Sequence, residues 1–100
     1  MIYTLTNPIT VGDLNNPLLI DKLELASVSL NFEPTYSDKG AAILSVVLVH
    51  RASGYKVNVV YIDATALAFW TTLNTVGSVV TKSVFTKLTA DGKLPAGTLA

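Results

Sequence analysis

The sequence predicts an α+β domain, with an antiparallel sheet of about four strands, a β-hairpin at its centre and two C-terminal helices packed on one face. Segments rich in Val, Ile, Leu and Thr alternate with turn-forming residues over residues 1–62, which is typical of strands. Apolar residues recur at helical spacing after Asp63. The chain has 100 residues, a length that suits one domain with one hydrophobic core.

Residues 1–17 are predicted to form an extended arm. Turn formers at Asn7-Pro8, Gly12-Asp13 and Asn15-Asn16-Pro17 interrupt short apolar pieces and allow only one or two short strands. Such an arm pairs with the edge of its own sheet or with that of a neighbour, because either edge satisfies its backbone hydrogen bonds. The residues leave both arrangements open.

A long strand is predicted over Leu18–Phe32. Its apolar residues change parity midway, so that a β-bulge near Ala26-Ser27 would return all of them to one buried face. Pro34 has no backbone N–H and therefore ends the strand. The polar segment Thr35–Gly40 is predicted to be an exposed loop.

The centre of the sheet is predicted to be a hairpin over Ala41–Ile62. Its first half, Ala41–His50, is almost continuously apolar and rich in β-branched residues, which is typical of a strand covered on both faces. Only four residues, Arg51–Gly54, separate it from the β-rich segment Tyr55–Ile62. So short a link predicts an antiparallel pair.

A first helix is predicted from about Asp63 to Asn74. Asp63 is a good N-cap, and the residues that follow at helical spacing form one apolar stripe, made of Ala66, Phe69, Trp70 and Leu73. Aromatic residues on such a stripe are expected in the core or at a subunit interface.

A second helix is predicted after Ser78, which is a candidate cap. Its apolar stripe consists of Val80, Val84, Phe85 and Leu88, and Gly92 is placed to end it. The remaining residues, 93–100, contain Pro and Gly and are predicted to form an extended tail.

The composition favours association with other protein surfaces. Half of the residues are apolar, only 14% are charged, and seven basic residues balance seven acidic ones. So little charge leaves little repulsion between copies, and contact through apolar patches becomes easy. Without a basic run, a nucleic-acid partner is not expected. The longest apolar run, Ala41–Val49, is too short for a membrane span, and no membrane partner is expected.

The residues that usually carry chemistry are sparse. His50 is the only histidine, and no local motif supplies the carboxylate and nucleophile that a general base needs. The carboxylates are scattered, there is no cysteine, and the glycines follow no phosphate-binding spacing. We therefore expect a non-enzymatic protein with no catalytic residue, cofactor, metal ligand or small-molecule substrate.

Aromatic side chains leave an alternative function open. Tyr55, Tyr61 and Trp70 on an open face would suit a small-ligand or carbohydrate-binding module.

Several stretches resemble small virion structural proteins of tailed bacteriophages. They comprise an opening of the type Leu5–Val11, the run from Gly54-Tyr55 through Val59–Asp63 into Ala66–Trp70, and the closing segment Leu88–Thr98. The resemblance implies a multi-copy structural subunit of the head, neck or tail, such as a head decoration protein. It brings no catalytic residues with it.

The predicted function is therefore a structural subunit of a phage particle, assembled in the host cytoplasm. Its expected partners are other virion proteins and copies of itself. Each terminus alone buries too little apolar surface to offset a backbone ordering cost of roughly 1–2 kcal/mol per residue, so both are expected to become ordered only on a partner. The candidate contact residues lie in these termini and are Ile2, Tyr3, Leu5, Leu94, Pro95 and Leu99.

Overall fold

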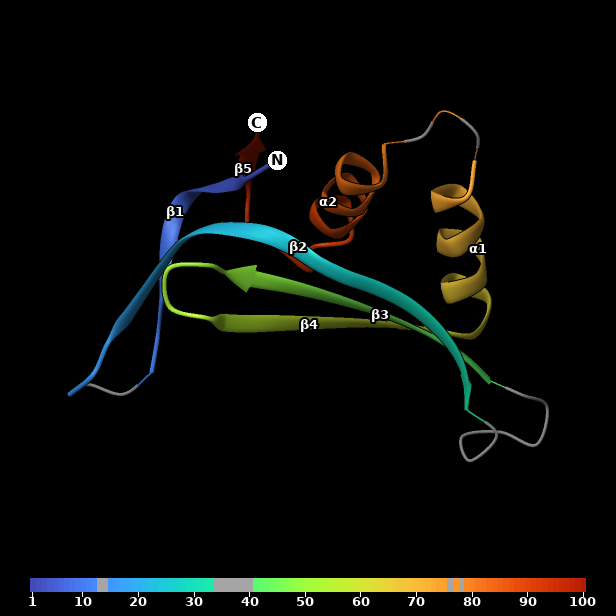
Figure 1. Ribbon diagram of the computed structural model, residues 1–100, viewed down its shortest axis with the longest axis horizontal. Helices are drawn as coiled ribbons and strands as arrows, with labels where there is room; N and C mark the ends of the chain where they lie inside the picture. The colour runs from blue at the N-terminus through green and yellow to red at the C-terminus, as the bar shows by residue number, and fades with distance from the viewer. Residues whose placement is uncertain (13–14, 34–40, 76, 78) are drawn as a thin grey trace.

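The computed structural model describes residues 1–12, 15–33, 41–75, 77 and 79–100. Within them the chain forms one five-stranded antiparallel sheet and two helices, which confirms the α+β class with one strand more than expected (Figure 1). The loop expected at Thr35–Gly40 and the cap expected at Ser78 lie outside the described residues.

The sheet has the strand order β4-β3-β2-β1-β5. Its strands are β1 (Tyr3–Val11), β2 (Leu18–Glu33), β3 (Ala41–His50), β4 (Tyr55–Ile62) and β5 (Gly97–Leu99), and the helices are α1 (Asp63–Leu73) and α2 (Val80–Ala90). The central hairpin is confirmed as the antiparallel pair β3–β4.

The long strand β2 belongs to both halves of the sheet. Its first residues pair with β1 and its later ones with β3, and the strand curves between them (Figure 1). The register shifts between Leu25 and Ser27, which confirms the bulge expected there. Because of this shift, Leu25 and Val28 face the same side of the sheet although their numbers differ in parity.

The hydrophobic core lies between the sheet and the helices. On β3, alternate residues are fully buried, and both helices turn their apolar stripes toward them. The core side chains of these three elements are Leu44, Val46, Leu48, Ala66, Phe69, Leu73, Val84, Phe85 and Leu88. Trp70 is half-buried and packs against this cluster.

The expected cap at Asp63 is not formed. The residue that precedes the helix is Ile62, and no side chain hydrogen-bonds to the first turn of α1. Strand β4 runs into α1 without a linker, so Asp63 itself makes the turn, with φ of 53°. Aspartate tolerates this left-handed conformation better than most residues with a side chain.

The expected arm and tail are strands of the chain's own sheet. Tyr3 and Leu5 of β1 and Leu94 are buried, and β5 pairs with β1. The Tyr3 ring stacks on Phe85 with ring centroids 4.8 Å apart, and its hydroxyl donates to the Pro95 carbonyl at 2.6 Å. The expectation that the termini become ordered only on a partner is therefore wrong. The two termini pair with each other and bury their apolar side chains in the core of this chain.

We predict that Gly97→Ala lowers the free energy of unfolding by about 1–3 kcal/mol, the usual cost of overpacking. A Cβ at position 97 would collide with the Thr4 carbonyl oxygen and lie 2.8 Å from the Tyr3 ring. Urea denaturation followed by circular dichroism measures the change. The exposed Thr98→Ala on the same strand is the control, and equal stability of the two variants would contradict close packing of β5 on β1.

Candidate functional site

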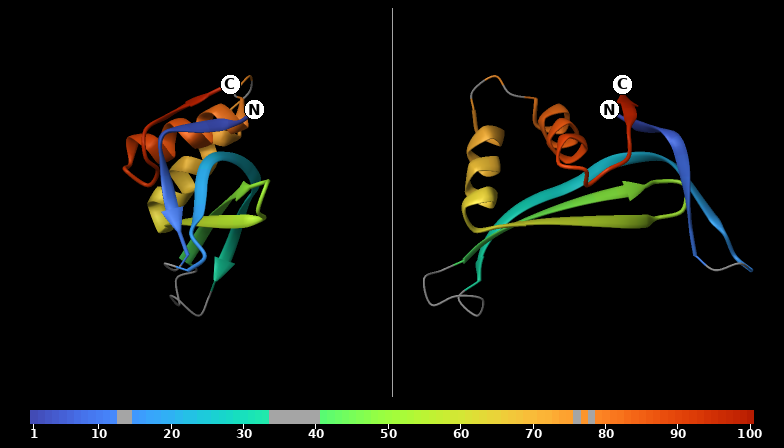
Figure 2. Two further views of the ribbon diagram at one scale, coloured as in Figure 1. Left: turned by 90° about the vertical axis from the view of Figure 1, so that its left-hand side faces the viewer. Right: turned by 180° about the vertical axis from the view of Figure 1, so that it is seen from behind.

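One face of β2, β3 and β4 is not covered by any described element. Both helices lie on the opposite side of these strands (Figure 2). We call the uncovered side the bare face. The pairing register arranges it in four cross-strand rows, which are Glu24, Val49 and Lys56; Ser27, Val47 and Asn58; Ser29, Ser45 and Val60; and Asn31, Ile43 and Ile62.

The apolar side chains of the bare face lie on β3 and on the second half of β4, whereas on this face β4 begins with Lys56 and Asn58 and β2 is polar throughout. Val60 and Ile62 of β4 are 51% and 58% exposed, and the β3 side chains beside them are only half-buried. In contrast, β2 contributes Glu24, Ser27, Ser29 and Asn31. The expectation that β3 is covered on both faces is therefore fulfilled on one face only among the described residues. The sequence does not single out these residues, because β3 is almost continuously apolar over Ala41–Val49 and has no alternation that would mark an uncovered face.

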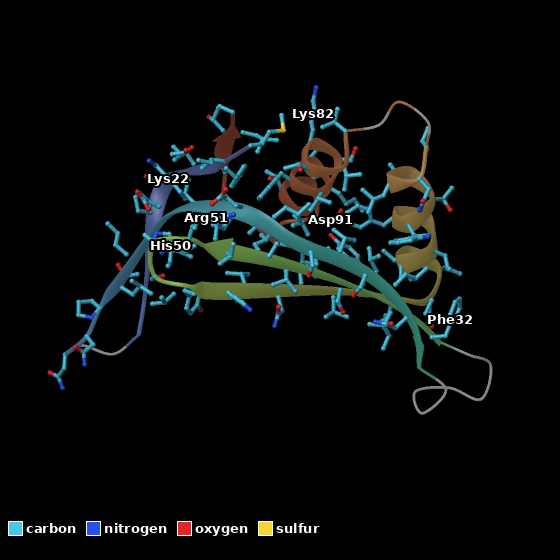
Figure 3. The ribbon with its side chains drawn as sticks, viewed as in Figure 1. Lys22, Phe32, His50, Arg51, Lys82 and Asp91 are labelled. Atoms are coloured by element: carbon cyan, nitrogen blue, oxygen red, sulfur yellow. The ribbon has the colours of Figure 1, made fainter. Side chains whose placement is uncertain are left out.

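A second feature lies at the other end of β3, where His50 contacts two polar side chains. Its Nε2 donates to the Asp21 carboxylate at 3.2 Å, and its Nδ1 lies 2.7 Å from Ser53 Oγ. His50 and Asp21 border a cleft of about 340 Å³ that Ile2 and Lys22 also line. Figure 3 labels His50 and Lys22 at this end of β3. Neither contact was predicted from the sequence. The contact with Asp21 depends on the register of β2, which no local pattern indicates.

The His50 contacts fasten the β3–β4 turn to β2. Ser53 Oγ also accepts the backbone N–H of Tyr55 at 3.2 Å, and the N–H groups of Ser53 and Gly54 donate to the His50 carbonyl. These backbone donors hold the turn and are therefore not directed toward a substrate. Beside them, the Glu24 carboxylate accepts a hydrogen bond from Arg51 and raises the pKa of that guanidinium.

Two grooves flank α2. The larger, about 590 Å³, lies between α2 and the paired termini and is lined mainly by apolar side chains, among them Met1, Phe85 and Leu99. The other, about 390 Å³, includes Thr72 of α1. Lys82 lines both grooves.

The residues predicted as terminal contacts are divided by the fold. Ile2 is exposed at the His50 cleft, Leu99 is half-buried in the groove beside α2, and Pro95 is exposed while its carbonyl accepts from Tyr3. The other three, Tyr3, Leu5 and Leu94, point into the core of this chain and are not accessible to a partner.

The aromatic residues considered for ligand binding do not share one surface. Tyr55 is exposed at the start of β4, whereas Tyr61 is buried with its ring edge-on to Phe69, at 5.1 Å between centroids. Trp70 lies on α1 and is half-buried.

Tyr61 connects the sheet to the end of α2. Its hydroxyl donates to the Asp91 carboxylate at 2.8 Å, and Lys87 lies 3.2 Å from the same oxygen. Burial, followed by the bond to Asp91, raises the pKa of Tyr61 well above its usual range. The hydrogen bonds from Tyr61 and Lys87 lower the pKa of Asp91.

No described helix is long and apolar enough to cross a membrane. In the same part of the chain, no three His, Cys, Asp or Glu side chains are grouped so that they could hold a metal ion.

We predict that Tyr61→Phe lowers the free energy of unfolding at pH 7 by about 1 kcal/mol, the usual net value of one hydrogen bond. Because the pKa of Tyr61 is raised by folding, its contribution is complete below the unfolded value of about 10 and is lost as the pH rises beyond it. The lowered pKa of Asp91 gives a contribution that is lost as the pH falls below about 4.

The difference between native protein and Tyr61→Phe should therefore narrow at both extremes of pH. Denaturant unfolding measured from acid to alkaline pH tests this. Tyr55→Phe, at an exposed tyrosine of the same strand, is the control and should change stability by less than about 0.5 kcal/mol. A constant difference across the pH range would contradict the assigned contact.

Comparison of the chain with protein-family models, with curated proteins and with solved structures found no match.

Proposed function

We propose that this protein is a non-enzymatic structural subunit that acts by joining protein surfaces, and that its setting is the capsid, neck or tail of a bacteriophage particle. The observation that carries the proposal is the bare face. It exposes apolar side chains of β3 and β4 side by side on a regular, eight-residue edge strand.

The bare face supports a contact with protein more than one with a small ligand. It belongs to a continuous sheet, and of the three described cavities only the cleft beside His50 reaches it, at Glu24. Ligand pockets are usually concave and enclose most of the ligand, whereas protein interfaces combine an apolar centre with a polar rim. The apolar rows of β3 and β4 beside the polar row of β2 fit the second description.

The virion setting is supported by the resemblance in the hairpin, the first helix and the closing segment. A multi-copy subunit of this kind needs a surface that stays accessible after folding and is covered during assembly. The bare face is accessible in the folded chain, whereas the buried residues of the termini are not.

We predict that Val60→Lys reduces incorporation into particles at least about tenfold, because it places a charge in the apolar part of the proposed interface. A tenfold loss corresponds to about 1.4 kcal/mol of binding free energy. The experiment complements a phage that lacks the gene for this chain with tagged variants and quantifies them in purified particles by mass spectrometry. Leu19→Lys is the matched control, since Leu19 is 57% exposed on β2 but lies outside the bare face.

Two results would contradict the proposed function. One is a native chain that is absent from purified particles while it is abundant in the infected cell. The other is equal incorporation of native protein and Val60→Lys, which would show that the bare face is not the assembly surface.

A further inference from the structure

We infer that the bare face binds the bare face of a second copy of this chain, with β3 of one copy packed over β3 of the other. This inference rests on the proposed function and names the partner of the same surface. The result is a two-fold symmetric sandwich of two sheets, with the helices of both copies on the outside.

The charges of the bare face are complementary to themselves in this arrangement. Glu24 and Lys56 have opposite charges and lie in the same row on either side of Val49. Glu24 also pairs with Arg51 of its own chain, and a further acidic residue of β2, Glu33, pairs with β3 at the far end of the face. A two-fold axis along β3 places β2 of one copy over β4 of the other at the same height. Glu24 then faces Lys56 of the second copy, and the symmetry produces this ion pair twice.

The same axis places Ser29 over Val60 and Asn31 over Ile62 of the second copy, so polar side chains of β2 meet apolar ones of β4 in two of the rows. Ile43, Val47 and Val49 lie on β3 and meet their own counterparts, which gives the sandwich an apolar centre. Ser27 faces Asn58 of the second copy, where a side-chain hydrogen bond is available to both. Packed sheets of this type cross at about 30°, and the long side chains of Glu24 and Lys56 span the displacement that this angle causes at the end rows.

The chain exposes more surface than a compact monomer of its mass. Its accessible surface is 6376 Å², against roughly 5,500 Å² for a compact monomer of the same mass. The difference of about 900 Å² is close to the roughly 800 Å² that each partner buries in a standard interface. The thin shape, 45 × 33 × 20 Å, is that of one sheet with helices on one side only.

A charge-swap experiment tests both the surface and the axis. Lys56→Glu alone gives two like-charge pairs in the dimer, and so does Glu24→Lys alone. When the two single variants are mixed, each dimer containing one of each again has two opposite-charge pairs. We expect each variant alone to weaken dimerisation at least about tenfold and the mixture to recover to within about threefold of the native value.

The measurement is sedimentation equilibrium over micromolar concentrations. The native chain should approach twice its 10.6 kDa mass. Thermal unfolding by circular dichroism verifies that each variant is folded, and Leu19→Lys serves as the control that should dimerise like the native chain.

A second measurement needs no substitution. Native chains with and without heavy-isotope labels are mixed and treated with a carbodiimide, which joins a carboxylate to an amine that contacts it. We expect a cross-link between Glu24 of one label and Lys56 of the other. This test remains decisive if a charge variant fails to fold.

Three outcomes would overturn the inference. A native chain that stays monomeric removes the second copy as partner; if Val60→Lys still reduces incorporation into particles, the proposed function stands and another protein covers the bare face. A dimer without recovery in the mixture uses another surface, such as the free edge of β4. A mixed-label sample without the Glu24–Lys56 cross-link contradicts the proposed axis.

Discussion

The sheet depends on the bulge between Leu25 and Ser27, which lies just after β2 changes partner, since β2 pairs with β1 up to Leu23 and with β3 from Glu24 onward. Side chains alternate between the two faces of a strand, so a slip of one residue moves every later side chain to the other face. The bulge supplies that slip once. It keeps Val28 and Leu30 on the same side as Leu23 and leaves a polar row of β2 on the bare face.

Contacts in the middle of α2 and just after its C-terminus then hold the helices on one side of the sheet. Tyr61 of β4 donates to Asp91 at the end of α2, and Phe85 within α2 stacks on Tyr3 of β1. Because β4 continues directly into α1, that helix has no linker with which to reach the other face. The apolar residues of β3 and β4 that point away from the helices are exposed or half-buried on the bare face.

Local patterns in the sequence predict the strands and helices, whereas the pairing of distant segments determines which surfaces these strands and helices cover. The hairpin, the bulge and the helical stripes follow from spacing between near neighbours, which a sequence displays directly. The pairing of β1 with β5 joins residues 3–5 to 97–99, and no local pattern indicates it. No local pattern indicates the contact between Asp21 and His50 either. Nor does the sequence indicate which face of β3 remains uncovered, since an apolar strand has the same pattern whether its second face packs on a helix or on another chain.

The bare face combines an apolar centre with a pair of opposite charges at one end, and these features have different consequences. Apolar contact is non-directional and would allow many relative orientations of two sheets. Charges limit the number of these orientations, because an orientation that brings two like charges together is destabilised. With Glu24 and Lys56 in one row on the outer strands, a two-fold axis along β3 satisfies both charges, whereas an axis across the strands places them far apart. In the proposed dimer, these two charges limit an otherwise unspecific apolar contact to one relative orientation of the sheets.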